Sequence, residues 1–262
     1  MNTKELREYF FKVLNPENRG FVDGVVNDLQ IDCENENIKK IAFGVTASLE
    51  FLEKAKEFGA DVVVLHHGIG LRDKYINNSV PILPIQRRLK FLYQNNISLF
   101  GFHFLLDADE NLGHNALALK NLGLNDLEGF GELKGPSSGF SHWGWKSKFD
   151  EDIDINEIFE KLNELYLGNA QIYQFGSKKI KKIGVVTGGA SSCIHEAYNE
   201  DLDLFVTGEV AEATQGFAKE YGINIIWGGH YITERVGVLA LMERVKKDLD
   251  VECEFIEVMN KI

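Results

Sequence analysis

Short apolar runs recur along this 262-residue chain, and each is followed or preceded by a segment with the spacing of an amphipathic helix. DVVVL (61–65) is apolar on both faces, which is typical of parallel strands covered by helices on both sides. Similar runs stand at 38–45, 97–103, 180–187, 202–207, 223–227 and 253–258. Strand and helix patterns that alternate in this way predict an α/β fold with layered sheets.

The two flanks of the chain resemble each other. IKKI stands at 38–41 and again at 180–183, and the same distance separates it from His66–His67 and from Gly208–Glu209. LFGFH (99–103) corresponds to IWGGH (226–230). We interpret this as two similar βα halves of one layered domain, about 1–125 and 179–262, joined by a compact connector at about 126–178. Two βαβ units that share composition by chance are the alternative.

The composition excludes several classes of protein. A net charge of −12 argues against nucleic acid and anionic membranes as partners, since both attract clustered Lys and Arg. No apolar run approaches the roughly 20 residues of a membrane span, and the first residues lack a signal-peptide pattern. Cys33, Cys193 and Cys253 form no CxxC pair, and we expect them to be buried and reduced. The sequence therefore predicts a cytoplasmic protein.

Histidines and carboxylates stand where the predicted strands end. His66 and His67 directly follow DVVVL, and ligands of open α/β sheets collect at the carboxyl ends of strands. His103 is followed four residues later by Asp107, and His230 by Glu234, a spacing that places both side chains on one helix face. Imidazole and carboxylate donors suit Zn, Mn, Fe, Co or Ni.

The number of donors favours two ions. The candidate ligands are His66, His67, Asp107, His230 and Glu234, more than the three that one catalytic metal usually takes. We expect two divalent metal ions per chain, at the carboxyl ends of the strands between the halves. A hydrogen-bonded structural role is the competing interpretation of any single histidine.

Other polar residues near these positions have weaker signals. We expect His103 to orient Asp107 or a bound water, with direct ligation as the alternative. Glu209 either hydrogen-bonds a ligand histidine or acts on a proton, and a carboxylate that only stabilises a helix start is the competing interpretation. We expect His114 on a helix surface, and His142 and His195 in structural roles. GVVTGGASS (184–192) has the form of a phosphate-binding turn but lacks a P-loop lysine, so we favour a packing turn. The segment 133–150 predicts a hairpin and a loop.

Five segments resemble the Nif-three-like dinuclear-metal-centre family, whose members are often described as type-two GTP cyclohydrolase I homologues. They are VVVLHHG, GFHFLLDADENLGHNALALKNLGL, IGVVTGGASSCIHEA, DLFVTGEV and GGHYITERVGV, between about residues 40 and 240. The resemblance implies the same five metal ligands, with Glu234 bridging the ions, and a toroidal homohexamer. It also implies an activity like that of a GTP cyclohydrolase.

Two departures from the family pattern concern the surroundings of the metals. Gly68 stands where the family commonly has Pro, and the family's histidine after T-G-E is absent from VAEATQ. Three interpretations of function follow. The first is a metal-dependent hydrolase of a phosphorylated or cyclic small molecule. The others are a metal-binding or metal-delivery protein without catalysis, and a ring-shaped scaffold or regulatory protein.

Overall fold

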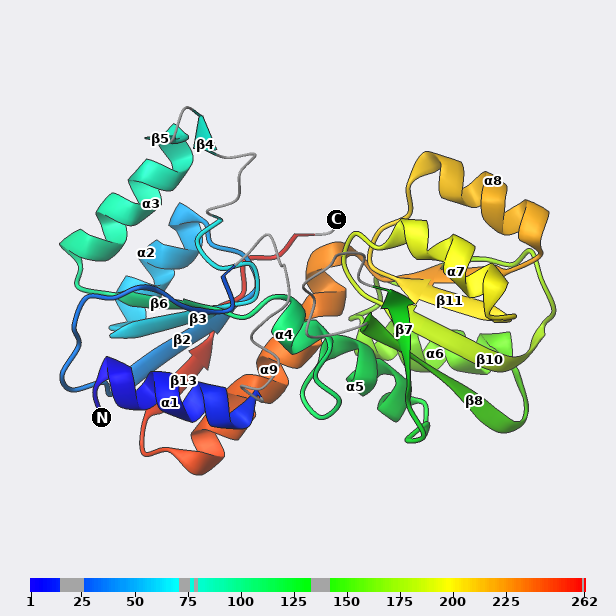
Figure 1. Cartoon of the computed structure of the whole chain (residues 1–262), viewed down its shortest axis with the longest axis horizontal. Helices are drawn as coiled ribbons and strands as arrows, with labels where there is room; N and C mark the ends of the chain where they lie inside the picture. The colour runs from blue at the N-terminus through cyan, green and yellow to red at the C-terminus, as the bar shows by residue number, and fades with distance from the viewer. Residues whose placement is uncertain (15–25, 71–75, 78–79, 133–141, 261) are drawn as a thin grey trace. The chain divides into compact units, whose positions relative to one another are not determined.

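The structure, a computed structural model, describes residues 1–14, 26–70, 76–77, 80–132, 142–260 and 262. The chain forms two compact units (Figure 1). Unit 1 holds the described residues of Met1–Leu106 and Val238–Val258, and unit 2 those of Asp107–Lys134, Phe140–Gly237 and Met259–Ile262. Two helices contain a boundary between units, α4 (Phe104–Asp107) and α9 (His230–Asp248). None of the described helices is long and apolar enough to cross a bilayer.

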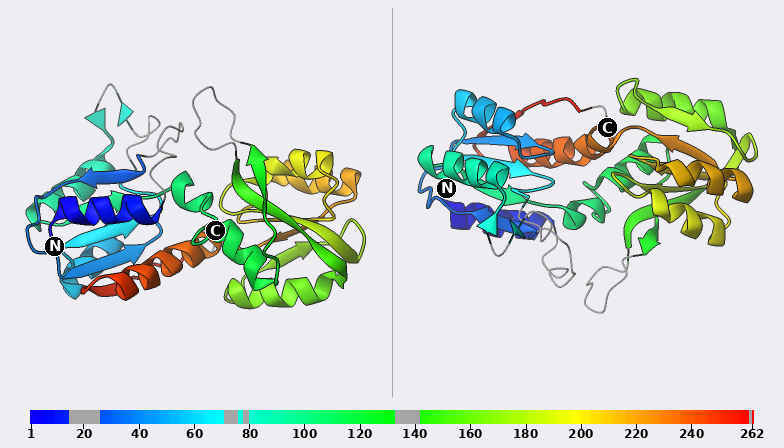
Figure 2. Two further views of the ribbon diagram at one scale, coloured as in Figure 1. Left: turned by 60° about the horizontal axis from the view of Figure 1, so that its bottom comes forward. Right: turned by 90° about the horizontal axis from the view of Figure 1, so that it is seen from above.

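Unit 1 is built on a five-stranded sheet of order β1-β6-β3-β2-β13, in which only the β1–β6 pair is antiparallel. Helices α2 and α3 cover one face, and α1 and the end of α9 lie on the other (Figures 1 and 2). The elements of the unit are α1 (Thr3–Val13), β1 (Asp28–Ile31), β2 (Lys40–Gly44), α2 (Leu49–Phe58), β3 (Val62–Leu65), β4 (Ile76–Asn77), β5 (Val80–Pro81), α3 (Leu83–Gln94), β6 (Ser98–Gly101) and β13 (Glu252–Phe255).

Unit 2 is built on a six-stranded sheet of order β7-β8-β10-β11-β12-β9, with parallel pairs from β10 to β12. The segment predicted as a connector supplies β7, β8 and β9 to this sheet. The elements are α5 (His114–Asn121), β7 (Glu128–Glu132), β8 (His142–Asp154), α6 (Ile155–Leu165), β9 (Gln171–Tyr173), β10 (Lys179–Val186), the 3-10 helix η3 (Ser191–Cys193), α7 (Ile194–Asn199), β11 (Leu204–Thr207), α8 (Glu212–Tyr221) and β12 (Asn224–Trp227).

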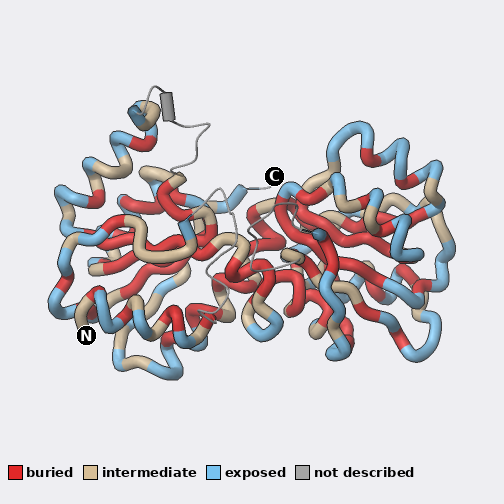
Figure 3. Tube along the Cα trace, viewed as in Figure 1, coloured by how far each residue is buried: buried red, intermediate tan, exposed pale blue. Residues whose placement is uncertain are grey.

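Each sheet has its own apolar core. The central strands β3, β6 and β11 are buried along their whole length, and they form the red interior of each unit in Figure 3. In unit 1, Phe51 and Leu52 of α2 pack against Val63 and Leu99 of the sheet. In unit 2, Ala218 of α8 packs in the cluster that also holds Phe205 and Ile225. The predicted α/β class with two similar halves is therefore confirmed.

The two halves share a hydrogen-bond pattern between their parallel strands. One oxygen of Asp61 accepts the backbone N–H groups of Lys39 and Lys40, at 2.7 and 3.0 Å. Asp203 accepts those of Lys181 and Lys182 in the same way, at 2.9 and 2.8 Å. In both units this carboxylate stands one residue before a central strand and accepts two backbone N–H groups of the neighbouring segment, which supports the predicted repeat.

The strand register corrects one part of that prediction. Val62 pairs with Ser98 in unit 1, and Leu204 pairs with Asn224 in unit 2. These pairs make Ser98 equivalent to Asn224. Counted onward from there, His103 is equivalent to Gly229, and His230 is equivalent to Phe104. The alignment of LFGFH with IWGGH was therefore wrong by one residue. The reason is that His103 lies just before its helix, whereas His230 is the first residue of α9.

Two other expectations need correction or limitation. Cys33, Cys193 and Cys253 are free, but each is only partly buried, because they lie near the rims of the cores rather than within them. Burial still raises the pKa of Cys193 to about 12 and that of Cys253 to about 11, so both remain protonated thiols. An antiparallel β7–β8 pair is present, but its first strand lies at Glu128–Glu132, before the segment 133–150 where the hairpin was predicted; residues 133–141 lie outside the described part of the chain.

Candidate metal centre

Three histidines of unit 1 lie together where β3 and β6 end. His66 and His67 follow β3, and His103 follows β6 two residues after its last residue, Gly101. The ring centre of His66 lies 4.9 Å from that of His67 and 5.0 Å from that of His103. One ring nitrogen from each of the three lies within 4.8 Å of the others. This is the spacing of donors that could share a cation.

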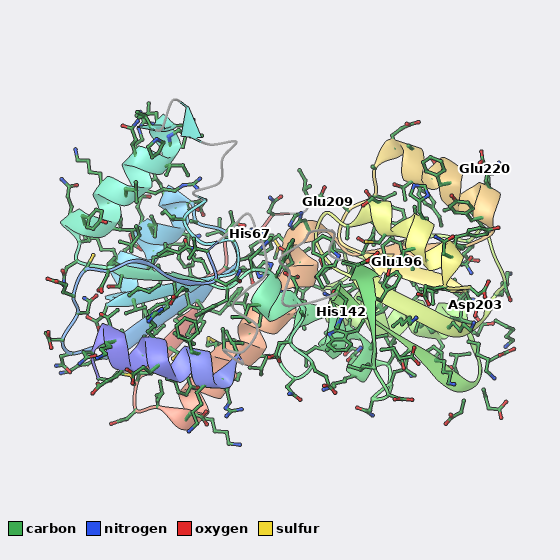
Figure 4. All side chains as sticks on the ribbon, viewed as in Figure 1. His67, His142, Glu196, Asp203, Glu209 and Glu220 are labelled. Atoms are coloured by element: carbon green, nitrogen blue, oxygen red, sulfur yellow. The ribbon has the colours of Figure 1, made fainter. Side chains whose placement is uncertain are left out.

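The hydrogen bonds of the pair fix how each ring is presented. His66 is 1% exposed, and its Nδ1 donates to the backbone oxygen of Phe102 at 2.9 Å. A carbonyl oxygen only accepts, so Nδ1 carries the proton and Nε2 of the neutral ring presents its lone pair. His67 (Figure 4) contacts Oγ1 of Thr46 through Nδ1 at 2.8 Å. Partners on one ring nitrogen are typical of metal-binding histidines, because they orient the other nitrogen.

A second group of donors lies in unit 2, where α9 begins. His230 and Glu234 are one turn apart, and Nε2 of His230 lies 3.1 Å from Oε1 of Glu234. Nδ1 of His230 donates to Oε1 of Glu209, which follows β11 and is labelled in Figure 4. The side chain of Glu234 is 4% exposed and that of His230 30% exposed, so the pair is accessible from the histidine side.

The charges around His230 show what the position attracts. Burial lowers its pKa, but the hydrogen bonds and charges of Glu234 and then Glu209 outweigh burial and raise the pKa to about 9. Two carboxylates on opposite nitrogens of one imidazole therefore favour positive charge strongly. A divalent cation on Nε2 would satisfy the same preference, and it would bind both His230 and Glu234.

Glycines leave room for this pair. The predicted phosphate-type turn after β10 contains Gly188, whose φ is +66°, and a Cβ there would lie 2.3 Å from Oε1 of Glu234 and 3.2 Å from Nε2 of His230. A Cβ at Gly208 would lie 2.7 Å from the backbone N and O of Gly188. The turn packs against the candidate ligands, which agrees with the packing interpretation favoured above.

The surroundings of Asp107 include two neighbouring residues of α5, His114 and Asn115. Asp107 is 3% exposed, and its Oδ1 lies 4.0 Å from Nε2 of His114. Nδ1 of His114 accepts the N–H of Gly237 at 3.0 Å, so the proton of the neutral ring is on Nε2, which faces Asp107. His114 is 0% exposed, so the expectation of a helix-surface residue was wrong. The neighbouring residue Asn115 donates from its side-chain amide to the backbone oxygen of Asp107 at 3.2 Å. Its Oδ1 accepts the N–H of Thr187 at 2.7 Å.

The remaining histidines have structural partners. The ring of His142 packs edge-on against Trp145 at 4.6 Å, and burial lowers its pKa. Nδ1 of His195 bonds the hydroxyl group of Tyr221 at 2.9 Å. Neither belongs to a group of candidate donors among the described residues.

The donor set fits a divalent transition metal. Each unit places imidazole nitrogens or carboxylate oxygens at the carboxyl ends of its parallel strands, and each group includes a histidine whose second nitrogen is held by the protein. Zn, Mn, Fe, Co and Ni all accept such nitrogen and oxygen donors. Fold and site thus define an α/β protein with a candidate metal centre of histidines and carboxylates.

The chain matches the family Duf34/NIF3 (NGG1p interacting factor 3) over residues 1–261. It belongs to this family, and the resemblance given by the sequence is confirmed. A relative from Archaeoglobus fulgidus, named GTP cyclohydrolase 1 type 2 homolog, is 36% identical over 261 residues, which are 98% of each chain.

Solved structures show the same fold. That of protein ybgI, described as of unknown function, has a TM-score of 0.83 at 30% identity and covers 100% of both chains. That of a protein from Thermus thermophilus has a TM-score of 0.81 at 26% identity, again over 100% of both. Gly68, which departs from the family pattern predicted from the sequence, has a φ of +58°. Proline, the residue expected at this position, cannot adopt such a value.

Proposed function

We propose that the protein binds two divalent metal ions per chain and uses them to hydrolyse a phosphorylated or cyclic small molecule. The residues that would hold the ions are His66, His67, Asp107, His230 and Glu234. The observation that supports this most is that the histidines of unit 1 and the His230–Glu234 pair of unit 2 each form a compact group of donors with one nitrogen already oriented. The metal is Zn, Mn, Fe, Co or Ni.

When bound, the ions would supply Lewis-acid stabilisation of charge on a substrate oxygen and a nucleophile at neutral pH. The chain's own groups would prepare the site for this. The carbonyl oxygen of Phe102 holds His66, and the carboxylate of Glu209 holds His230, so both rings present Nε2. His103 and His114 would orient the ligands beside them rather than bind metal.

The substrate class is supported by the relatives. Their name, GTP cyclohydrolase 1 type 2 homolog, refers to a phosphorylated molecule with a cyclic base. We propose a substrate of this chemical type, with GTP as the first compound to test. A net charge of −12 argues against nucleic acid as substrate or partner.

Elemental analysis of the untagged protein, as purified and after reconstitution with each of the five metals, tests the proposal. We expect about two ions per chain, since five donors suit a dinuclear site. The loaded protein is then assayed for consumption of GTP and for release of phosphate from phosphorylated small molecules. Metal at trace level after every reconstitution would exclude the dinuclear site. Two ions without turnover of any such compound would instead favour metal delivery or a structural role.

The proposal includes a toroidal homohexamer in the cytoplasm. Family membership supports the hexamer, and the acidic composition and three free thiols support the location. Light scattering at micromolar concentration should give six times the mass of one chain. A monomer under these conditions would exclude the ring.

A further inference from the structure

Strand β1 lies at the edge of the unit 1 sheet, beside the strand that leads to His103. It runs antiparallel to β6, with Asp28 opposite Gly101 and Leu29 opposite Phe100. The segment DLQI has no apolar run, and the sequence did not predict a strand there. Two amide side chains, Asn27 just before this strand and Gln30 within it, reach the backbone of the loops that carry the three histidines.

Gln30 binds the loop that follows the His66–His67 pair. Its Oε1 accepts the N–H of Ile69 at 2.8 Å, and its Nε2 donates to the backbone oxygen of Val26 at 2.6 Å. Ile69 is 0% exposed, so its N–H group needs this partner. The carboxamide therefore ties the histidine loop to the chain that enters β1.

Two glycines let the carboxamide of Gln30 approach closely. A Cβ at Gly68 would lie 2.3 Å from Nε2 of Gln30, and a Cβ at Gly101 would lie 2.2 Å from the same atom. The Cβ at Gly101 would also lie 2.9 Å from the Cα of Gly68. The loop after β3 and the end of β6 thus pack backbone against backbone, and the Gln30 amide lies against both. This contact sets the separation between His66–His67 and His103.

Asn27 holds the other loop. Its Oδ1 accepts the N–H of His103 at 2.6 Å and that of Leu105 at 3.3 Å. These N–H groups lie at the start of α4, where a helix lacks internal acceptors for its first donors. The bonds fix the backbone of His103 and the direction in which α4 leaves it.

We infer that Gln30 and Asn27 are positioning residues. They hold the proposed ligands His66 and His67, and His103, which orients them, in the arrangement required for metal binding. The inference rests on the proposed function, since it assigns a purpose to the spacing of these rings. Loops can shift, whereas a metal site tolerates little displacement of its donors. Groups that orient metal ligands typically change metal affinity by about 10- to 100-fold when removed.

The test compares Gln30→Leu with Gln94→Leu. Both variants replace a carboxamide by an apolar group of similar size, but Gln94 is an exposed residue at the end of α3. Cobalt(II) is titrated into each metal-free protein, and its visible absorption spectrum reports the ligand geometry. We expect Gln30→Leu to weaken cobalt binding about 10- to 100-fold and to change the spectrum, with Gln94→Leu matching the unchanged protein. Asn27→Leu should behave like Gln30→Leu.

A second readout does not depend on metal. Nitrogen-15 NMR of the metal-free protein reports the ring environment of each histidine, and we expect shifts for His66, His67 and His103 in Gln30→Leu but not for His195. Unchanged affinity, spectrum and ring resonances would overturn the inference. If the unchanged protein bound no cobalt, the proposed function would fail, while the ring resonances would still decide the positioning role. If Gln30→Leu did not fold, Gln30→Glu, which keeps the acceptor for Ile69 but loses the donor to Val26, would carry both measurements.

Discussion

We expect His230→Ala to lose most of the metal that the protein binds and to leave the fold largely intact. The variant deletes the imidazole that Glu209 orients and that faces Glu234 at 3.1 Å. Loss of a direct ligand should weaken metal binding by at least the roughly 100-fold that loss of an orienting group can cause. The side chain is 30% exposed and lies outside the apolar cluster of unit 2, so its removal creates no large cavity. Elemental analysis and thermal unfolding of the purified variant measure both effects.

His195→Ala is the matched control, because it removes a histidine of the same unit whose ring bonds a tyrosine hydroxyl group. We expect its metal content to equal that of the unchanged protein. Global unfolding of His230→Ala, with His195→Ala stable, would show that the site is primarily structural. Full metal content in His230→Ala would remove this residue from the ligand set.

Gly188→Ala should weaken metal binding at the same site, because the added Cβ would collide with a proposed ligand. The new Cβ would lie 2.3 Å from Oε1 of Glu234, and φ at this position is +66°. Glu234 is buried, so it cannot turn into solvent, and either the carboxylate or the turn must move. We expect metal affinity to fall by about 100-fold and the free energy of unfolding to fall by about 1–3 kcal/mol. Metal titration and denaturant unfolding measure the two quantities.

Gly222→Ala separates backbone strain from the steric clash. Gly222 ends α8 with φ at +70°, and a Cβ there would meet no atom within 4 Å. This variant should lose about 1 kcal/mol of stability from the left-handed conformation and keep its metal. If both variants lost the same stability and kept their metal, the close approach of Gly188 to Glu234 would have no role in the site.

Much of the fold could be predicted because the central strands are buried on both faces. DVVVL and LDLFVT have no polar face, so their place inside a sheet covered by helices follows from the sequence. Ser48 caps α2, and Gly59 ends it with φ at +85°, in line with the general preference for serine at helix starts and glycine just past helix ends. Strand β1 was missed because an edge strand needs no apolar run. In DLQI only the last residue, Ile31, is buried, and the other three are partly exposed.

The sequence could predict which residues are candidate donors, but not the contacts that hold them in place. Adjacent histidines and the two His-x-x-x-acid spacings identify donors, because spacing along a helix determines which side chains share a face. What holds those donors depends on contacts between distant segments. His114 is buried because Gly237, far along the chain, leaves space where a Cβ would lie 2.5 Å from the ring. The amides of Gln30 and Asn27 likewise act on loops at residues 69 and 103, and such contacts have no local pattern.

The order of the strands in unit 1 bears on how the chain is synthesised. β2 lies between β3 and β13, and β13 comes from Glu252–Phe255, near the other end of the chain. During translation the whole of the unit 2 sheet is made before β13 exists, and until then the apolar strand β2 is an open sheet edge. Edges of this kind can pair with other chains. The N-terminal unit is therefore the last to complete its sheet, and ribosome-bound chains that end before residue 252 carry an unprotected strand.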